Sequence, residues 1–184
     1  MPRQGRRRSA ARVVGALVVV SAAAGCSSDG PVTTTTTVSL ATADCAASPP
    51  KLRVDLIEQA IASVEAQLGG TQQYFEINAT DLLVNLFVAV DDATMVKPFV
   101  FLQGELNSTD SEPANGPTFT ASSVDIDPQT ITSCIAEQLP DSTLVRFQMF
   151  VGATGSITYS VTVESSRGGQ LGVTVDGRGH ILSV

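Results

Sequence analysis

The sequence predicts an α+β domain: two pseudo-repeated units, each a helix followed by antiparallel strands, that form one sheet with the helices packed on one face. Three observations predict this fold. Apolar residues recur at helical spacing in two segments, apolar and polar residues alternate in the strands of the second half, and both halves repeat the same order of elements.

The first predicted helix runs from Arg53 to Leu68, with its apolar residues on one face and its acidic residues off it. Gly69-Gly70 ends the helix, because glycine adopts the left-handed conformation of a C-cap without strain. Two apolar, strand-like segments follow, Thr80 to Val90 and Val96 to Leu106. Asp91-Asp92 between them indicates a turn.

The second unit starts after a polar connector, Asn107 to Pro117. Phe119 to Ile126 is predicted to form a short strand. The second helix then begins with Asp127 as N-cap and Pro128 at the first helical position, where the missing N–H costs nothing. Pro140 stops it.

The strands of the second unit follow from their alternation. From Ile157 to Glu164 apolar and polar residues alternate, which is typical of an antiparallel strand with one wet face. The chain turns at Ser166 to Gly169 and returns with the same pattern from Leu171 to Val175. It turns again at Asp176 to Gly179, and His180 to Val184 is expected to form a last short strand.

The N-terminal 25 residues have the character of a secretory signal peptide. Five arginines precede an apolar stretch, Val13 to Ala24, which is too short to cross a bilayer as a helix of about 20 residues. We expect residues 1–25 to be removed; a membrane anchor left uncut is the alternative. The general export route is favoured over the twin-arginine route, because Ser9-Ala10-Ala11 lacks a bulky apolar pair.

Cys26 follows the small residues Ala22 to Gly25 and precedes Ser27-Ser28. This arrangement resembles the lipobox of bacterial lipoproteins. The resemblance implies that the Cys26 thiol receives a diacylglyceryl group and that the leader is cut just before it. The lipid would hold the protein at the extracytoplasmic face of the cell membrane. A cut signal peptide with an incidental cysteine is the alternative.

Residues 26–48 are expected to be a disordered tether, because they are rich in polar residues and contain the run Thr33 to Thr37. The run is a candidate for O-glycosylation, with a bare linker as the alternative. Residues 49–184 are expected to be a single domain, with a first unit at 49–106, a connector at 107–117 and a second unit at 118–184.

Charge excludes some classes of partner. The chain has 11 basic and 18 acidic residues, for a net charge of −7. Loss of the five leader arginines leaves six basic residues against 18 acidic ones, for a net charge of −12. A domain this acidic is a poor candidate for binding nucleic acid, whose phosphates require Lys and Arg. It is also repelled by anionic lipid headgroups, so the acyl chains of Cys26 are the expected membrane contact.

Three cysteines remain to be placed. If Cys26 is acylated, Cys45 and Cys134 are left as a pair in an oxidising compartment, which predicts a disulfide. The alternative is two free thiols, with Cys134 filling a small apolar gap. His180 is the only histidine and is expected to be exposed and inert. Because the cysteines have other uses, we expect no metal site and no cofactor, and an enzyme is the least favoured class.

The first pair of strand-like segments is apolar on both faces. A strand of this kind is usually buried on both faces, which would place the first hairpin centrally under a helix and a loop. The alternative is that its second face is a groove or contact surface. The candidate binding surface consists of Leu83, Phe87, Phe99 and Phe101.

The second half resembles the PepSY-type pattern in its amphipathic helix, in Ile157 to Val163 and in Val173 to Gly179. Tandem helix-plus-sheet units of this type occur in secreted bacterial proteins and are associated with binding or inhibiting other proteins. The mature region also resembles actinobacterial envelope lipoproteins of unassigned activity. We expect a non-catalytic protein-binding module, because of the pseudo-repeat, the wet face of Thr158, Ser160 and Thr162, and a domain size that is small for a large lipid cavity. Another envelope protein is the expected partner. The alternative is a carrier of an apolar ligand or lipid in a pocket under the first hairpin.

Overall fold

The computed structural model describes residues 45–47 and 50–184. Its helical elements are the 3-10 helix η1 (Arg53–Leu56), α1 (Ile57–Leu68), the 3-10 turn η2 (Ala121–Ser123) and α2 (Ile131–Gln138). Its strands are β1 (Gln73–Ala79), β2 (Val84–Val90), β3 (Met95–Leu102), β4 (Glu105–Ser108), β5 (Glu112–Pro113), β6 (Phe119–Thr120), β7 (Ser142–Val151), β8 (Ile157–Ser165), β9 (Gln170–Val175) and β10 (Ile181–Ser183).

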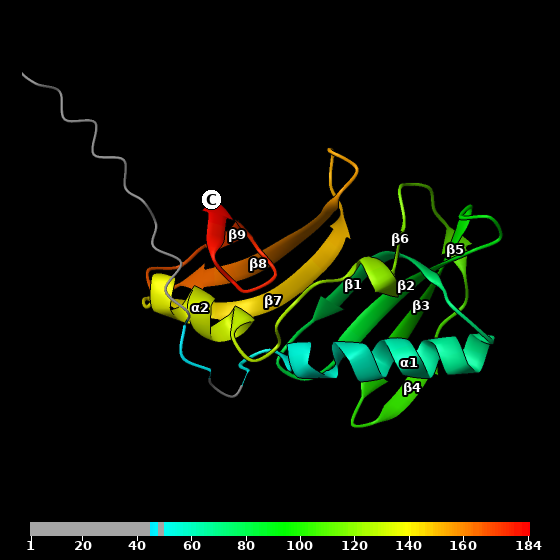
Figure 1. The fold of residues 1–184 in the computed structure, drawn as a ribbon, viewed down its shortest axis with the longest axis horizontal. Helices are drawn as coiled ribbons and strands as arrows, with labels where there is room; N and C mark the ends of the chain where they lie inside the picture. Colours follow the sequence, from blue (N-terminus) through cyan, green and yellow to red (C-terminus); the bar gives the residue numbers. More distant parts are fainter. Residues whose placement is uncertain (1–44, 48–49) are drawn as a thin grey trace, which may run out of the picture. The chain divides into compact units, whose positions relative to one another are not determined.

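The strands form one ten-stranded antiparallel sheet. Its main path runs β10-β9-β8-β7-β1-β2-β3-β4, while β5 pairs with β3 and β6 pairs with β1. The two α-helices have only twelve and eight residues. The predicted α+β fold of two helix-plus-strand units is therefore wrong, since the described part of the chain is mainly β. In Figure 1, α1 lies in front of the strands of the first half and α2 in front of β7.

Two strands that the sequence pattern missed, β1 and β7, cause this difference. They pair with each other antiparallel, with Ile77 opposite Met149, and so join the two halves into one sheet. Each carries a register shift, at Tyr74/Glu76 in β1 and at Leu144/Arg146 in β7. A β-bulge adds one residue and interrupts the period-two alternation by which a strand is found in a sequence.

The first helix lies where the periodicity predicts it, as η1 followed by α1. Gly69 is its C-cap at a φ of 83°, and the N–H groups of Gly69 and Gly70 both donate to the Glu65 carbonyl. The apolar residues of α1 are buried against the sheet: Ile57, Ala60, Ile61 and Val64. These residues are three or four apart, which places them on one helix face.

Other predicted boundaries need correction. α2 begins at Ile131, not at Pro128, and the Asp127 side chain accepts a hydrogen bond from the Gln129 N–H within a turn that precedes the helix. The segment Phe119 to Ile126 is a strand only over its first two residues. The second segment of the first hairpin is two strands, because the chain reverses at Gln103-Gly104, where both residues have positive φ.

The core lies between the helices and one face of the sheet. Its largest fully buried side chains come from α1, α2 and both halves of the sheet, including Tyr74, Phe99, Phe101 and Phe147. The alternating strands of the second half are confirmed: Val161, Val163, Val173 and Val175 are buried in this core. The intervening Thr158, Ser160 and Thr162 are half-buried on the other face.

Candidate functional site

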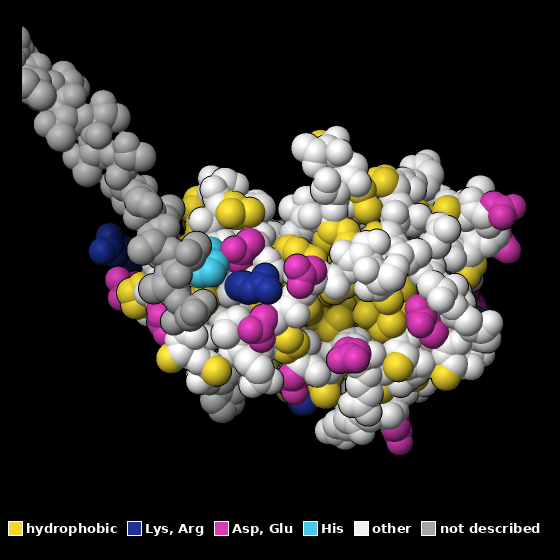
Figure 2. Space-filling view, viewed as in Figure 1, with side chains coloured by type: hydrophobic (Ala, Val, Ile, Leu, Met, Phe, Trp, Pro, Cys, Tyr) yellow, Lys and Arg dark blue, Asp and Glu magenta, His cyan; other side chains and the backbone are white. Residues whose placement is uncertain are grey.

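An apolar groove of about 440 Å³ lies on the helix side of the sheet. One wall comes from η1 and α1, through Val54, Ile57, Glu58 and Ile61. The other wall comes from the segment after β6, through Ala121, Ser122, Val124, Ile126 and Pro128. We call this feature the α1 groove. Figure 2 shows hydrophobic side chains gathered in a hollow of this face, with acidic side chains around it.

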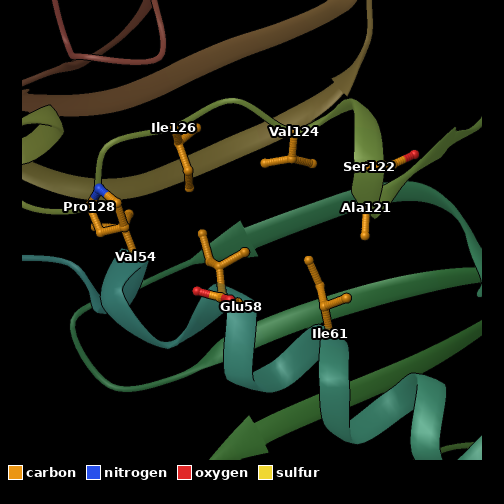
Figure 3. A pocket seen from close by; sticks show the side chains of 9 residues that line it. Val54, Glu58, Ile61, Ala121, Ser122, Val124, Ile126 and Pro128 are labelled. Atoms are coloured by element: carbon orange, nitrogen blue, oxygen red, sulfur yellow. The ribbon is translucent and has the colours of Figure 1, made fainter.

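The two walls are built differently. Val54, Ile57 and Ile61 recur at helical spacing, so η1 and α1 together present them as one stripe. The opposite wall is an extended segment in which Val124 and Ile126 are two residues apart and point the same way, toward α1 (Figure 3). The extended wall thus offers a second row of apolar side chains that no element covers within the described residues.

The extended wall is held from its far side. The Tyr159 hydroxyl accepts a hydrogen bond of 2.9 Å from the Asp125 N–H, and the Asp127 N–H donates to the Gly177 carbonyl at 2.8 Å. These bonds attach the wall to β8 and to the turn after β9. The two hydrogen bonds therefore fix the position of the extended wall.

The volume and the mainly apolar lining residues of the α1 groove are features that ligand-binding sites share. Its volume lies within the range of roughly 300–1,000 Å³ that is usual for small-molecule sites. Glu58 is its single ionisable residue and is exposed at the rim. The Ser122 side chain points away from α1 (Figure 3). An apolar body inside, with a hydrogen-bond donor or cation near Glu58, is the ligand chemistry that this lining fits.

The structure divides the predicted binding surface between two faces. Phe99 and Phe101 are fully buried in the core, with exposed fractions of 0% and 1%. Leu83 and Phe87 are half-buried, and Phe87 lies on the opposite face of the sheet, beside Glu76 in β1. The four residues are not brought together, because successive residues of a strand point to opposite faces. None of them lines the α1 groove.

The face opposite the helices carries a polar network. The Asn85 side chain donates to Asn78 Oδ1 at 2.8 Å, and Asn78 and Gln148 both donate to Glu76 Oε1, at 2.7 and 3.0 Å. Asn78 is only 4% exposed, so its amide is satisfied inside the protein. Phe150 lies beside Glu76 in register on this face. We call this region the network face.

The predicted disulfide is confirmed. Cys45 and Cys134 are bonded, with a Cα–Cα distance of 5.2 Å, and the bond links the chain before η1 to α2. Cys26 and nearly all of the predicted tether lie outside the described residues. Among residues 45–47 and 50–184, no helix has the length and apolar character needed to span a membrane.

His180 is half-buried next to this disulfide and not exposed as expected. Its Nδ1 lies 2.9 Å from Asp176 Oδ2, and Asp176 Oδ1 accepts hydrogen bonds from the N–H groups of Arg178 and His180. Partial burial acts to raise the pKa of Asp176, but the hydrogen bonds from His180 and Arg178 and the nearby imidazole outweigh it. The pKa of Asp176 therefore lies below its usual value.

Sequence reasoning missed the α1 groove. Its one available signal was the pair Val124 and Ile126, which alternate with polar residues outside any strand. The sequence pattern instead predicts Ile126 as the end of a short strand that starts at Phe119. No protein-family model matches the chain, and no curated protein or solved structure matches it either.

Proposed function

We propose that this protein is a non-catalytic binding module, held at the extracytoplasmic face of the membrane by a lipid on Cys26, and that the α1 groove binds an apolar ligand such as an acyl chain. The observation that carries the proposal is the groove itself. It is apolar on both walls, has a ligand-sized volume, and leaves Val124 and Ile126 partly open to solvent. Apolar surface in a concave site is the usual lining of a ligand pocket.

The location of the groove changes the carrier hypothesis. The carrier was expected to use a pocket under the first hairpin, near Leu83 and Phe101, but Phe101 is packed in the core. The α1 groove lies instead between α1 and the segment after β6. An acyl chain in it would gain roughly 25 cal/mol for each Å² of apolar surface removed from water. The glutamate at the rim would favour a ligand with a donor group beside its apolar part.

A fluorescent long-chain fatty amine and the matching fatty acid, titrated into the purified full chain, test this proposal. Val124→Asp places a charge in the groove and is expected to weaken binding of both probes at least about tenfold, or about 1.4 kcal/mol. Val100→Asp is the matched control, because Val100 is also a half-buried valine but lies on the network face. Equal binding by wild type and Val124→Asp would refute the proposal.

A second function has its own supporting observation. The network face combines the hydrogen-bonded amides of Asn85 and Asn78 with the half-buried rings of Phe87 and Phe150. Aromatic anchors among polar groups are typical of protein interfaces. In this function the module binds another envelope protein. A partner captured from envelope extract by wild type should be lost with Phe87→Glu and kept with Val124→Asp; the reverse result would assign it to the α1 groove.

A further inference from the structure

The disulfide and the only histidine of the chain form one cluster. The sulfurs of Cys45 and Cys134 and a ring nitrogen of His180 lie within 4.8 Å of one another. Cys134 is 1% exposed, while Cys45 and His180 are half-buried. The cluster brings together three segments that are far apart in the sequence: the chain before η1, α2 and the turn between β9 and β10.

The two ring nitrogens of His180 have different surroundings. Nδ1 is hydrogen-bonded to Asp176 Oδ2 at 2.9 Å. Nε2 is buried and has no hydrogen-bond partner among the described residues. A buried polar atom without a partner is unfavourable and calls for an explanation. In metal sites, a ligating histidine commonly has one ring nitrogen hydrogen-bonded to a carboxylate while the other ring nitrogen binds the metal.

Contacts other than the disulfide hold Cys134 and His180 in place. The Gln138 amide donates to the carbonyl of Cys134 at 2.9 Å and to the carbonyl of Gly179 at 3.0 Å. Its Oε1 accepts a hydrogen bond from the Ile181 N–H at 3.1 Å. Gln138 thus joins α2 to both residues that flank His180. None of these three hydrogen bonds involves a sulfur of the disulfide.

We propose that reduction of Cys45–Cys134 turns this cluster into a binding site for one Zn²⁺ ion, held by the two cysteine sulfurs and by His180 Nε2, with Asp176 orienting the imidazole. The reductant is a dithiol, which becomes a cyclic disulfide as it transfers two electrons and two protons to the S–S bond. The two resulting thiols release their protons when they bind the ion. Zn²⁺ then occupies the position beside His180 Nε2, the nitrogen without a hydrogen-bond partner in the described part of the chain.

The donor set selects the ion. Two thiolates and one imidazole suit Zn²⁺ and disfavour Mg²⁺ and Ca²⁺, which prefer oxygen ligands. Three protein ligands leave a fourth position for water or another donor. The oxidised protein lacks both thiolates and is therefore not expected to bind the ion, so that the site depends on redox state.

Metal titration of the full chain tests the proposal, with Cys26→Ser in every sample to remove the third thiol. The protein is reduced, freed of reductant under argon and titrated with Co²⁺ as a spectroscopic probe, then with Zn²⁺. The reduced protein should bind one equivalent of Co²⁺, with a thiolate-to-cobalt charge-transfer band that Zn²⁺ removes. The oxidised protein and Cys134→Ser should show no such band.

Two variants separate this site from adventitious binding to thiols. His180→Gln should weaken the affinity for Zn²⁺ at least about tenfold. Asp176→Asn replaces the carboxylate beside Nδ1 with a neutral amide whose oxygen can still accept from the Arg178 and His180 N–H groups, and it should weaken the affinity about 10- to 100-fold. Affinities equal to that of wild type in both variants would overturn the proposal. Circular dichroism is recorded on each sample. A reduced protein that loses its β spectrum and does not regain it with Zn²⁺ would overturn it as well.

Discussion

Gly179 lies directly against the main-chain carbonyl of Ile131, so closely that a Cβ at position 179 would overlap the carbonyl oxygen. Gly177 is in the same situation against the carbonyl of Asp125. The turn between β9 and β10 therefore packs backbone to backbone against the start of α2 and the segment before it. This packing places His180 beside the disulfide and holds the extended wall of the α1 groove.

Gly179→Ala should accordingly be severely destabilising. Gly179 has a φ of +92°, so an alanine there would meet both backbone strain and a carbonyl that cannot move aside. Gly168 is a matched control, because its φ of +88° is similar but the space around it is open. We expect a loss of about 1–2 kcal/mol for Gly168→Ala from strain alone and of at least about 4 kcal/mol for Gly179→Ala.

Urea unfolding of the two glycine variants measures this difference. If Gly179→Ala unfolds at the same urea concentration as Gly168→Ala, the close packing of the turn on α2 is not as described. Failure of Gly179→Ala to fold while Gly168→Ala folds would agree with the prediction.

Replacement of both Cys45 and Cys134 with alanine should lower the free energy of unfolding by about 4–5 kcal/mol in the chain-entropy account of disulfides. The bond joins residues that are 89 apart in the sequence. Closing so long a loop lowers the conformational entropy of the unfolded chain and so destabilises the unfolded state. Chemical denaturation of the oxidised wild type and the double variant gives the difference. A Cys26→Ala control should unfold like the wild type, and a difference below about 1 kcal/mol would contradict the entropic account.

Tyr74→Phe should stabilise the protein, in contrast to most core substitutions. Tyr74 is fully buried, and its hydroxyl has no hydrogen-bond partner among the described residues. An unsatisfied buried hydroxyl costs about 1–3 kcal/mol. Tyr159→Phe is the matched control with the opposite sign, since it removes the bond from the Asp125 N–H and should cost about 0.5–1.5 kcal/mol. Thermal unfolding of the two variants shows the sign of each change.

The same tyrosine predicts a dependence on alkaline pH. Burial, and secondly the charge of Glu65, raise the pKa of Tyr74 above its usual value, so the folded state favours the protonated phenol. The contribution of the protonated Tyr74 phenol to the free energy of unfolding is complete below the pKa of tyrosine in the unfolded chain, which is about 10. It is lost as the pH rises above that value. Between pH 9 and roughly pH 11, the free energy of unfolding should therefore fall more for wild type than for Tyr74→Phe. Parallel curves would refute this assignment.

Cys26→Ala should leave an uncleaved precursor and abolish the mature, membrane-retained form. The reason is chemical, because alanine has no thiol to receive the diacylglyceryl group that precedes cleavage in lipoproteins. Membrane fractionation and intact mass spectrometry of the exported protein measure both effects. Ser27→Ala is the neighbouring control and should be processed normally. A Cys26→Ala protein that is still cut and retained on the membrane would exclude lipidation as the anchor.

Local sequence pattern was sufficient for several elements. The alternation from Ile157 to Glu164 predicted β8, because one strand face is buried and the other is wet. Helical spacing and Gly69-Gly70 predicted η1 and α1 with their C-terminal end. The pairing of Cys45 with Cys134 followed from assigning Cys26 to lipid, and the structure contains that bond. Each of these inferences depends on neighbours in the chain or on a simple count.

Tertiary structure alone decided the fold class and the candidate site. Bulges in β1 and β7 interrupt the alternation of buried and exposed residues. In β1 the buried residues Tyr74 and Ile77 are three positions apart, and in β7 Leu144 and Phe147 have the same spacing. Neither strand therefore shows the period of two that identifies a strand in a sequence. Pairing of these two strands makes the sheet continuous. The α1 groove and the proximity of His180 to the disulfide arise from contacts between distant segments, and no local period encodes which segments will meet.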